Sequence, residues 1–215
     1  MQKGAIFDLD GTLLDSMEMW GHIERDYLIE RGITPRPGMN DDLQLLGGLE
    51  VPVYFQAEYG LRESLMEIQA GINKLAEDAY LHYLPLKDGV IALLDEFRAR
   101  GVKMCVATAT DACLVEPALR RCGVLGYFER IFSCVQEETS KNNPEIFIRA
   151  AAFLGSGICD TLVVEDAPHA MITAKNAGFP IAAVYDRAFS NKQGEIKSFC
   201  DIYVESLDEL RNYLW

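Results

Sequence analysis

The stretch Gly4-Ala5-Ile6-Phe7-Asp8-Leu9-Asp10-Gly11-Thr12 places four apolar residues directly before two carboxylates that lie two positions apart. A short apolar run is typical of a buried parallel strand, and open α/β sheets bind ligands beyond the carboxyl ends of such strands. Two acids at this place repel each other unless a cation or a proton lies between them, and Gly11 allows a sharp turn. The stretch therefore predicts a strand that ends in a metal-assisted site, although Asp-Gly is also a common turn dipeptide.

The composition is that of a globular protein with an acidic surplus. Of 215 residues, 33 are Asp or Glu and 20 are Lys or Arg, which gives a formal net charge of -13. The chain has no run of Lys and Arg that could follow a phosphate backbone, so nucleic acids and anionic membranes are poor partners. The length suffices for one ordinary domain with a modest insertion, and we expect a monomer or weak homodimer.

The six cysteines stand singly, without a Cys-x-x-Cys pair or a histidine at the spacing of zinc ligands. This pattern favours reduced thiols. The N-terminal residues lack the apolar stretch and cleavage site of a secretory signal, and no apolar run approaches the about 20 residues of a membrane span. We therefore expect a cytoplasmic protein.

Beyond the first strand, the chain divides into a helical stretch and an alternating stretch. Residues 16–84 carry apolar positions at helical spacing, with a turn-rich segment at 35–42. After Pro85, helices alternate with strands that are expected at 102–107, 131–134, 161–164, 180–185 and 201–204. This alternation predicts an α/β fold, a doubly wound parallel sheet of residues 1–15 and 85–215 with an inserted α-helical cap domain of residues 16–84.

If the sheet is parallel, polar residues that follow several strands converge on one edge. The sequence offers four such points: Asp8 with Asp10, Thr108, Lys141, and Glu165 with Asp166. Taken singly, the last three are also compatible with a strand-end threonine, a solvated loop charge and a helix cap. Together, the oxygen ligands favour Mg²⁺, and a carboxylate beside a lysine can attack phosphorus. The set therefore predicts phosphoryl transfer.

These motifs and their order resemble the haloacid dehalogenase-like superfamily over nearly the whole chain, specifically the β-phosphoglucomutase and phosphatase branch with a helical cap. The resemblance implies that Asp8 is the nucleophile and Asp10 the general acid and base. It also implies that Thr108 donates a hydrogen bond to the phosphoryl group and that Lys141 steadies this group. The implied Mg²⁺ ligands are the Asp8 carboxylate, the Asp10 backbone carbonyl, and Asp166 with Glu165 beside it.

The chain departs from the family pattern at two positions. Family members commonly have Gly-Lys-Pro around the lysine, where this chain has Ser140-Lys141-Asn142. They also commonly have a glycine four positions after the metal-binding aspartate, where this chain has Ala170. Neither departure removes a functional group.

The resemblance implies Mg²⁺-dependent hydrolysis of a small phosphorylated metabolite, such as a sugar phosphate or nucleotide, through an aspartyl-phosphate. One alternative is a phosphomutase of the β-phosphoglucomutase type, which returns the phosphoryl group to a sugar. Another is a non-catalytic metabolite-binding or regulatory protein on the same scaffold. Mutases use basic cap residues to hold a second phosphate. The basic residues of the expected cap show no matching spacing, which favours hydrolysis: Arg25, Arg31, Arg36, Arg62 and Lys74.

Two parts of the expected cap are candidates for ligand contacts. His22 lies on the first expected helix and is a candidate to lean over the site. The glycine pair in Leu46-Gly47-Gly48-Leu49 would permit a close approach to a ligand. We expect Trp20, by contrast, to pack in the core of the cap, as aromatic residues at helical spacing usually do.

Overall fold

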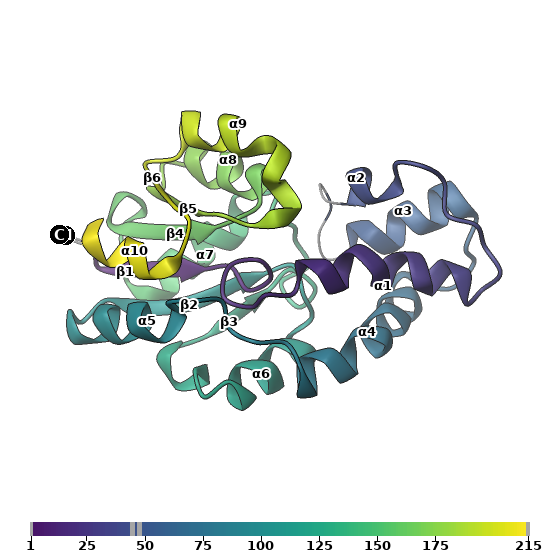
Figure 1. The fold of residues 1–215 in the computed structure, drawn as a ribbon, viewed down its shortest axis with the longest axis horizontal. Coiled ribbons are helices and arrows are strands. Elements are labelled where there is room, and N and C mark those ends of the chain that lie inside the picture. Colours follow the sequence, from purple (N-terminus) through teal and green to yellow (C-terminus); the bar gives the residue numbers. More distant parts are fainter. Residues whose placement is uncertain (1, 44–45, 47–48, 214–215) are drawn as a thin grey trace.

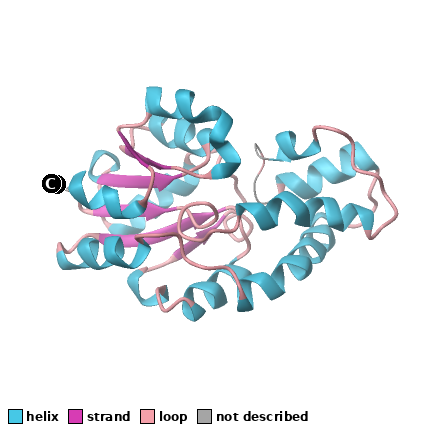
Figure 2. Ribbon diagram, viewed as in Figure 1, coloured by secondary structure: helices cyan, strands magenta, loops and turns pink. Residues whose placement is uncertain are grey.

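The computed structural model describes residues 2–43, 46 and 49–213, and these form an α/β fold around one parallel sheet (Figures 1 and 2). Neighbouring strands all pair in parallel. Across the sheet they follow the order β3 (Ile131–Ser133), β2 (Lys103–Thr108), β1 (Gly4–Phe7), β4 (Thr161–Glu165), β5 (Ile181–Val184) and β6 (Ile202–Val204). The predicted fold class, a doubly wound parallel sheet, is confirmed.

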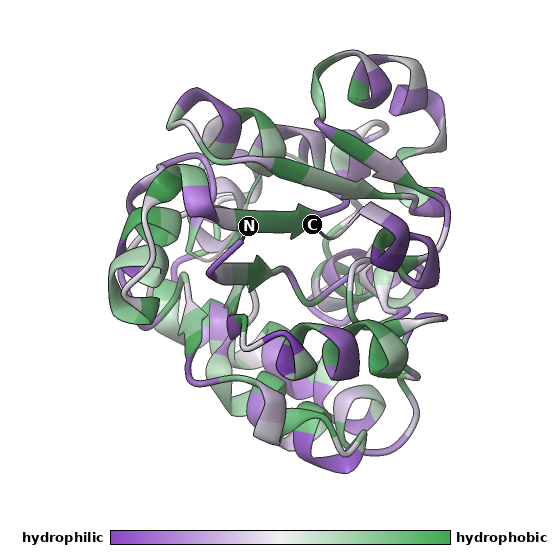
Figure 3. Ribbon diagram, turned by 90° about the vertical axis from the view of Figure 1, so that its left-hand side faces the viewer, coloured by the Kyte–Doolittle hydropathy of each residue, from purple (hydrophilic) through white to green (hydrophobic). Residues whose placement is uncertain are grey.

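Helices pack on both faces of the sheet, so its strands are buried on both sides. Figure 3 shows strands in the hydrophobic colour with helices around them. These helices are α5 (Val90–Ala99), α6 (Ala112–Arg121), α7 (Glu145–Leu154), α8 (Pro168–Asn176), α9 (Gln193–Phe199) and α10 (Leu207–Leu210). Short 3₁₀ turns lie at Leu125–Tyr127, Ile158–Asp160, Arg187–Lys192 and Arg211–Tyr213.

Successive strand residues point to opposite faces, so each strand contributes to two hydrophobic clusters. Phe7 and Val106 belong to the cluster that includes α5, α6 and α10. Ile6 and Cys105, one position earlier on the same strands, belong to the cluster that includes α7, α8 and Ile196 of α9. This burial holds the strand ends, and the polar residues that follow them, in fixed positions.

Residues 16–84, which we call the helical lobe, lie beyond the carboxyl edge of the sheet (Figure 1). The lobe has a hydrophobic cluster of its own, which includes Tyr27, Phe55 and Ile72. Its helices are α1 (Met17–Ile29), α2 (Met39–Leu43), α3 (Glu50–Tyr59) and α4 (Leu65–His82). The division into a core domain of residues 1–15 and 85–215 and a cap domain of residues 16–84 stays a prediction.

The two connections between the lobe and the sheet lie side by side. The Asp15 amide donates to the Pro85 carbonyl oxygen at 3.0 Å, and the Lys87 amide donates to the Leu13 carbonyl oxygen at 2.9 Å. Lys87 also donates its ammonium group to the Gly11 carbonyl oxygen at 2.6 Å and to Asp186 at 2.8 Å. The second connection is thereby tied to the loop that follows β1.

Two helical segments were not predicted from the sequence. Helix α2 occupies positions 39–43, which overlap the turn-rich segment expected at 35–42. Helix α9 and the turn before it fill the interval between β5 and β6. Both helices are short, so they offer few apolar positions from which a period can be read. Among the described residues, no helix combines the length and the apolar character that crossing a membrane requires.

Candidate active site

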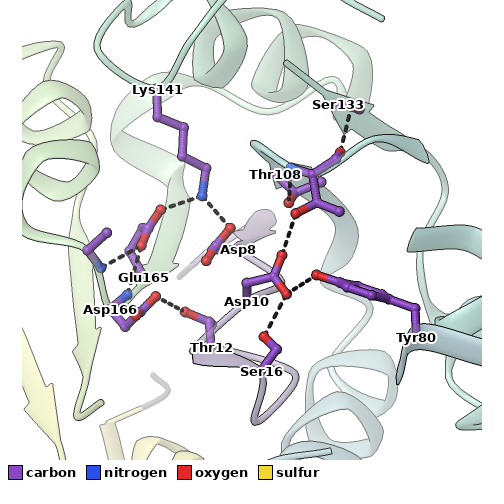
Figure 4. A network of polar contacts seen from close by, with 12 residues as sticks. Asp8, Asp10, Thr12, Ser16, Tyr80, Thr108, Ser133, Lys141, Glu165 and Asp166 are labelled. Atoms are coloured by element: carbon purple, nitrogen blue, oxygen red, sulfur yellow. Dashed lines mark hydrogen bonds and ion pairs between the residues drawn. The ribbon is translucent and has the colours of Figure 1, made fainter. Parts of the chain in front are cut away.

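The predicted site residues meet at the centre of the carboxyl edge of the sheet. In the order β3-β2-β1-β4-β5-β6, the direction of strand succession reverses between β1 and β4, where open α/β sheets bind ligands. Asp8 follows β1, and Glu165 ends β4 with Asp166 next to it. Thr108 ends the neighbouring strand β2, and Lys141 reaches in from the loop before α7. Figure 4 shows these side chains around Asp8.

Lys141 links two of the carboxylates. Its ammonium group donates to Asp8 Oδ1 and, at 2.5 Å, to Glu165 Oε1 (Figure 4). Only 4% of Lys141 is exposed. Burial alone would lower the pKa of Lys141, but Asp8 and Glu165 raise it above its usual value. Lys141 is therefore a fixed positive charge beside Asp8.

Glu165 is held by the protein on both of its oxygens. While Oε1 accepts from Lys141, Oε2 accepts from the backbone amides of Asp166 and Ala167, each at 2.8 Å. Glu165 is fully buried. These contacts fix the turn that presents Asp166 to the site.

Asp166 leaves one oxygen open. Its Oδ1 accepts a hydrogen bond from the Thr12 hydroxyl at 3.0 Å. Its Oδ2 is buried and has no hydrogen-bond partner among the described residues. Gly11 keeps the space beside this oxygen free, because a Cβ at position 11 would lie 2.2 Å from Oδ2 and the backbone there has a φ of +82°. The arrangement therefore leaves one carboxylate oxygen unpaired in a buried cradle.

The carboxylates of this edge fit a divalent cation. Ligand oxygens of Asp8, Glu165 and Asp166 all lie within 4.8 Å of one another, and all three residues are buried. Burial, followed by the charge of Glu165, raises the pKa of Asp8 to about 7, and the same two causes raise the pKa of Asp166 well above its usual value. A cation would relieve this repulsion, and oxygen donors suit a hard divalent ion.

Asp10 lies beside Asp8 and is surrounded by hydroxyl groups from three parts of the chain. Ser16 donates to Oδ1 and Thr110 donates to Oδ2, each at 2.6 Å. Tyr80 of α4 also donates to Oδ1 (Figure 4) and accepts from the indole nitrogen of Trp20 at 2.9 Å. The lobe therefore touches the predicted general acid and base directly.

Sequence reasoning missed several members of this network. Ser16 directly precedes α1, but its hydroxyl donates to Asp10 and makes no capping hydrogen bond. Thr110 lies two residues beyond Thr108, and its amide donates to the Thr108 hydroxyl oxygen at 3.0 Å. A second hydroxyl so close to a predicted site residue was a signal that could have been read, whereas nothing in the sequence pointed to Tyr80.

A cavity lies between this edge of the sheet and the helical lobe. The core contributes Asp8, Asp10, Thr108, Thr110, Lys141, Asp166 and His169, among others. The lobe contributes Met17, Trp20, Gly21, Glu24, Asn40, Leu43, Leu46, Val51, Gln69 and Ile72. The predicted catalytic residues thus form one wall of the cavity, and lobe residues form the opposite wall.

The predictions for the lobe wall had mixed outcomes. His22 is exposed and is not among the residues that line the cavity, so it does not lean over the site. Trp20 is not only a packing residue, because it also lines the cavity. Leu46 lines the cavity as well, whereas the pair Gly47-Gly48 lies outside the described residues.

A family model described as haloacid dehalogenase-like hydrolase matches residues 5–184 of the chain. The chain belongs to this family. The match spans both the strand-end motifs and the helical lobe. The predicted resemblance is therefore confirmed, and with it the enzyme class, a hydrolase of this family.

Curated relatives include both phosphatases and a phosphomutase. Hexitol phosphatase B of Escherichia coli K12 is 26% identical over 175 residues, covering 80% of this chain and 79% of its own length. The β-phosphoglucomutase of Bacillus subtilis is 26% identical over 225 residues, covering 96% and 94%. The relatives therefore place the chain in a group of phosphoryl-transfer enzymes without choosing between hydrolysis and mutase chemistry.

Solved structures support the fold. CbbY from Rhodobacter sphaeroides, solved in complex with phosphate, superposes with a TM-score of 0.84 at 21% identity, covering 98% of this chain and 96% of that one. This likeness includes the helical lobe as well as the sheet.

Proposed function

We propose that the chain is a Mg²⁺-dependent phosphatase that hydrolyses a small phosphomonoester through an aspartyl-phosphate on Asp8. The observation that carries this proposal is the arrangement of Lys141, Asp8 and the unpaired Asp166 Oδ2 around one point at the sheet edge. A carboxylate nucleophile, a fixed cation and a place for a divalent ion are what phosphoryl transfer requires.

In the first half of the proposed reaction, an Asp8 oxygen attacks phosphorus and the bond between phosphorus and the leaving oxygen breaks. Asp10 donates the proton that the leaving oxygen needs. In the second half, Asp10 takes a proton from water, whose oxygen attacks the phosphorus and releases Asp8. Lys141 neutralises charge on the phosphoryl oxygens throughout, with Thr108 as a hydroxyl donor.

Asp8, Asp166 and the Asp10 backbone carbonyl are the proposed Mg²⁺ ligands, with Glu165 beside them. When bound, the ion supplies positive charge that balances the negative charge of the phosphoryl group. Glu165, whose oxygens bind Lys141 and two amides, orients its neighbour Asp166. This role does not require Glu165 to contact the ion.

Hydrolysis is favoured over a phosphomutase reaction by the lobe wall of the cavity. A mutase must hold a second phosphate, but among the described residues no Lys or Arg of the lobe lines the cavity. Three of the candidates are instead paired at the surface: Arg25 with Asp26, Arg31 with Glu63, and Arg36 with Asp42 and Glu58. The non-catalytic alternative is disfavoured because the nucleophile, the acid and the lysine are all in place.

The test is release of inorganic phosphate from an aryl phosphate and from a panel of phosphorylated metabolites. We expect turnover that requires Mg²⁺ and that falls at least about 10⁴-fold in Asp8→Asn. Asp78→Asn, which changes an exposed aspartate of α4, should retain full activity. Equal activity in both variants would contradict the proposal. Isomerisation of a hexose 1-phosphate in the presence of a trace of its bisphosphate would instead assign a mutase.

A further inference from the structure

Glu24 is the acidic residue of the lobe that lines the catalytic cavity. It lies on α1, one helical turn after Trp20, so both side chains are on the same face of the helix. Both line the cavity together with Asp8, Asp10 and Lys141 of the opposite wall. Glu24 therefore faces the space into which the leaving group of a bound phosphomonoester would extend.

Within the described residues, the Glu24 carboxyl has no hydrogen-bond donor and no ion-pair partner. Burial raises the pKa of Glu24 to about 8, and no neighbouring charge contributes to this shift. Other acids of the lobe are paired: Asp42 with Arg36 and Tyr54, for example, and Glu63 with Arg31. The Glu24 side chain is partly buried and its carboxyl has no donor from the described chain, so a ligand in the cavity can supply one.

The remaining lobe wall sets the chemistry of that ligand. It consists of aliphatic side chains, Met17, Gly21, the indole of Trp20 and the amides of Asn40 and Gln69, with no Lys or Arg among the described residues. The sequence of positions 44–48 contains no basic residue either. A second phosphate or a carboxylate on the substrate would find no counter-charge on this wall, and it would keep Glu24 from ionising, whereas an ammonium group would favour the ionised form.

Trp20 adds a second feature that suits a cation. Its indole nitrogen donates to the Tyr80 hydroxyl at 2.9 Å, and its ring lies edge-on to the Tyr80 ring with centroids 6.2 Å apart. These contacts hold the indole in one orientation at the cavity wall. An aromatic ring next to a carboxylate is a favourable environment for an ammonium group.

On the basis of the proposed phosphatase activity, we propose that the substrate is a phosphomonoester of a small amino alcohol, whose protonated amine binds Glu24 beside the Trp20 ring. The two charges of such a zwitterion are then bound on opposite walls of the cavity. Lys141 and the cation site take the phosphoryl group, and Glu24 takes the ammonium group. Glu24 thereby determines specificity without taking part in the chemical steps.

The test compares substrates that differ only in the charge of the terminal group. These are 2-aminoethyl phosphate against 2-hydroxyethyl phosphate, and 3-aminopropyl phosphate against 3-hydroxypropyl phosphate. We expect the protein to prefer an amine by at least about tenfold in kcat/KM for one of the two lengths. In Glu24→Gln this preference should fall to about one, mainly through a higher KM for the amine. The control Glu30→Gln, an exposed acid just beyond α1, should keep the preference.

A wild-type preference at or below one for both lengths would overturn the proposal, as would a preference that Glu24→Gln leaves unchanged. Binding to the Asp8→Asn protein with Mg²⁺, measured by calorimetry, separates this proposal from the proposed function. The ratio of Kd values for each amine and hydroxyl pair reports on Glu24 even if no phosphomonoester is hydrolysed. Absence of all turnover would thus refute the phosphatase, while an equal Kd within each pair would refute the amine site.

Discussion

The two walls of the cavity differ in how their carboxyl groups are hydrogen-bonded. On the core wall, Asp8 accepts from Lys141, and Asp10 accepts from three hydroxyl groups. On the lobe wall, the Glu24 carboxyl has no donor within the described part of the chain, and burial raises its pKa to about 8. The two reacting carboxylates of the core wall are thus hydrogen-bonded before a ligand arrives, whereas the Glu24 carboxyl of the lobe wall is not.

This difference corresponds to the two tasks of the site. Groups that act on phosphorus need fixed positions, because misplacement by about 1 Å can reduce the rate about 100-fold. Strand ends held between two hydrophobic clusters supply that rigidity. A group that recognises the leaving group is more selective when it has no hydrogen-bond partner in the free protein. Only a ligand with a matching donor then provides the missing hydrogen bond.

The largest expected effect follows from removing the Lys141 ammonium group from the core wall. In Lys141→Met, two buried carboxylates lose their counter-charge, so we expect a loss of kcat of about 10³-fold and of stability of about 3 kcal/mol. Steady-state kinetics and denaturant unfolding measure the two losses. Lys74→Met, at an exposed position of α4, is the control and should change neither. If Lys141→Met kept the kcat and the stability of the parent protein, as the control should, Lys141 would not be needed for catalysis or for the stability of the core wall.

The core wall could be predicted from sequence because β-sheet geometry converts order along the chain into proximity. Once the strands are parallel, the residues after β1, β2 and β4 must share one edge. Asp8, Thr108 and Asp166 therefore fall near one another without any knowledge of side-chain packing. The family pattern added Lys141, which lies in a loop that strand periodicity does not place.

The lobe wall could not be predicted in the same way, because the direction that a helix faces depends on how it packs. Successive helical residues differ by about 100°, so positions 20 and 24 share a face whereas position 22 points to the other side. The position of His22 on the first helix predicted that it would lean over the site, but the packing of α1 places Trp20 and Glu24 at the cavity instead. Tyr80 was equally hidden, since its contact with Asp10 joins residues 70 positions apart.

A smaller effect is expected at Tyr80, where the two walls touch. In Tyr80→Phe, Asp10 loses the donor that the lobe supplies but keeps Ser16 and Thr110. One hydrogen bond to a charged group corresponds to about 1.5 kcal/mol, so we expect kcat to fall about tenfold. The control is Tyr83→Phe, which should keep the parent kcat because Tyr83 is 69% exposed. An unchanged kcat would mean that the walls act independently.

The smallest expected effect concerns the stability of the open wall. Unfolded Glu24 ionises near its ordinary pKa of 4.5, whereas the folded protein keeps the proton until about pH 8. The folded state therefore binds more protons between these values, and its stability falls as the pH rises from 4.5 to 8.

Glu24→Gln removes this dependence, because an amide has no charge to bury. Because the Glu24 side chain is partly exposed and solvent screens its charge, we expect less than the full linkage energy. Glu24→Gln should match the parent protein near pH 4.5 and exceed it by about 1 to 2 kcal/mol at pH 8 and above. Urea unfolding across this range, with Glu30→Gln as the control, measures the difference. A variant that is less stable at pH 8 would show that the carboxylate has a partner in the folded chain. A gain in stability combined with a loss of amine preference would instead show that Glu24 lowers the stability of the free protein and makes the cavity selective for amines.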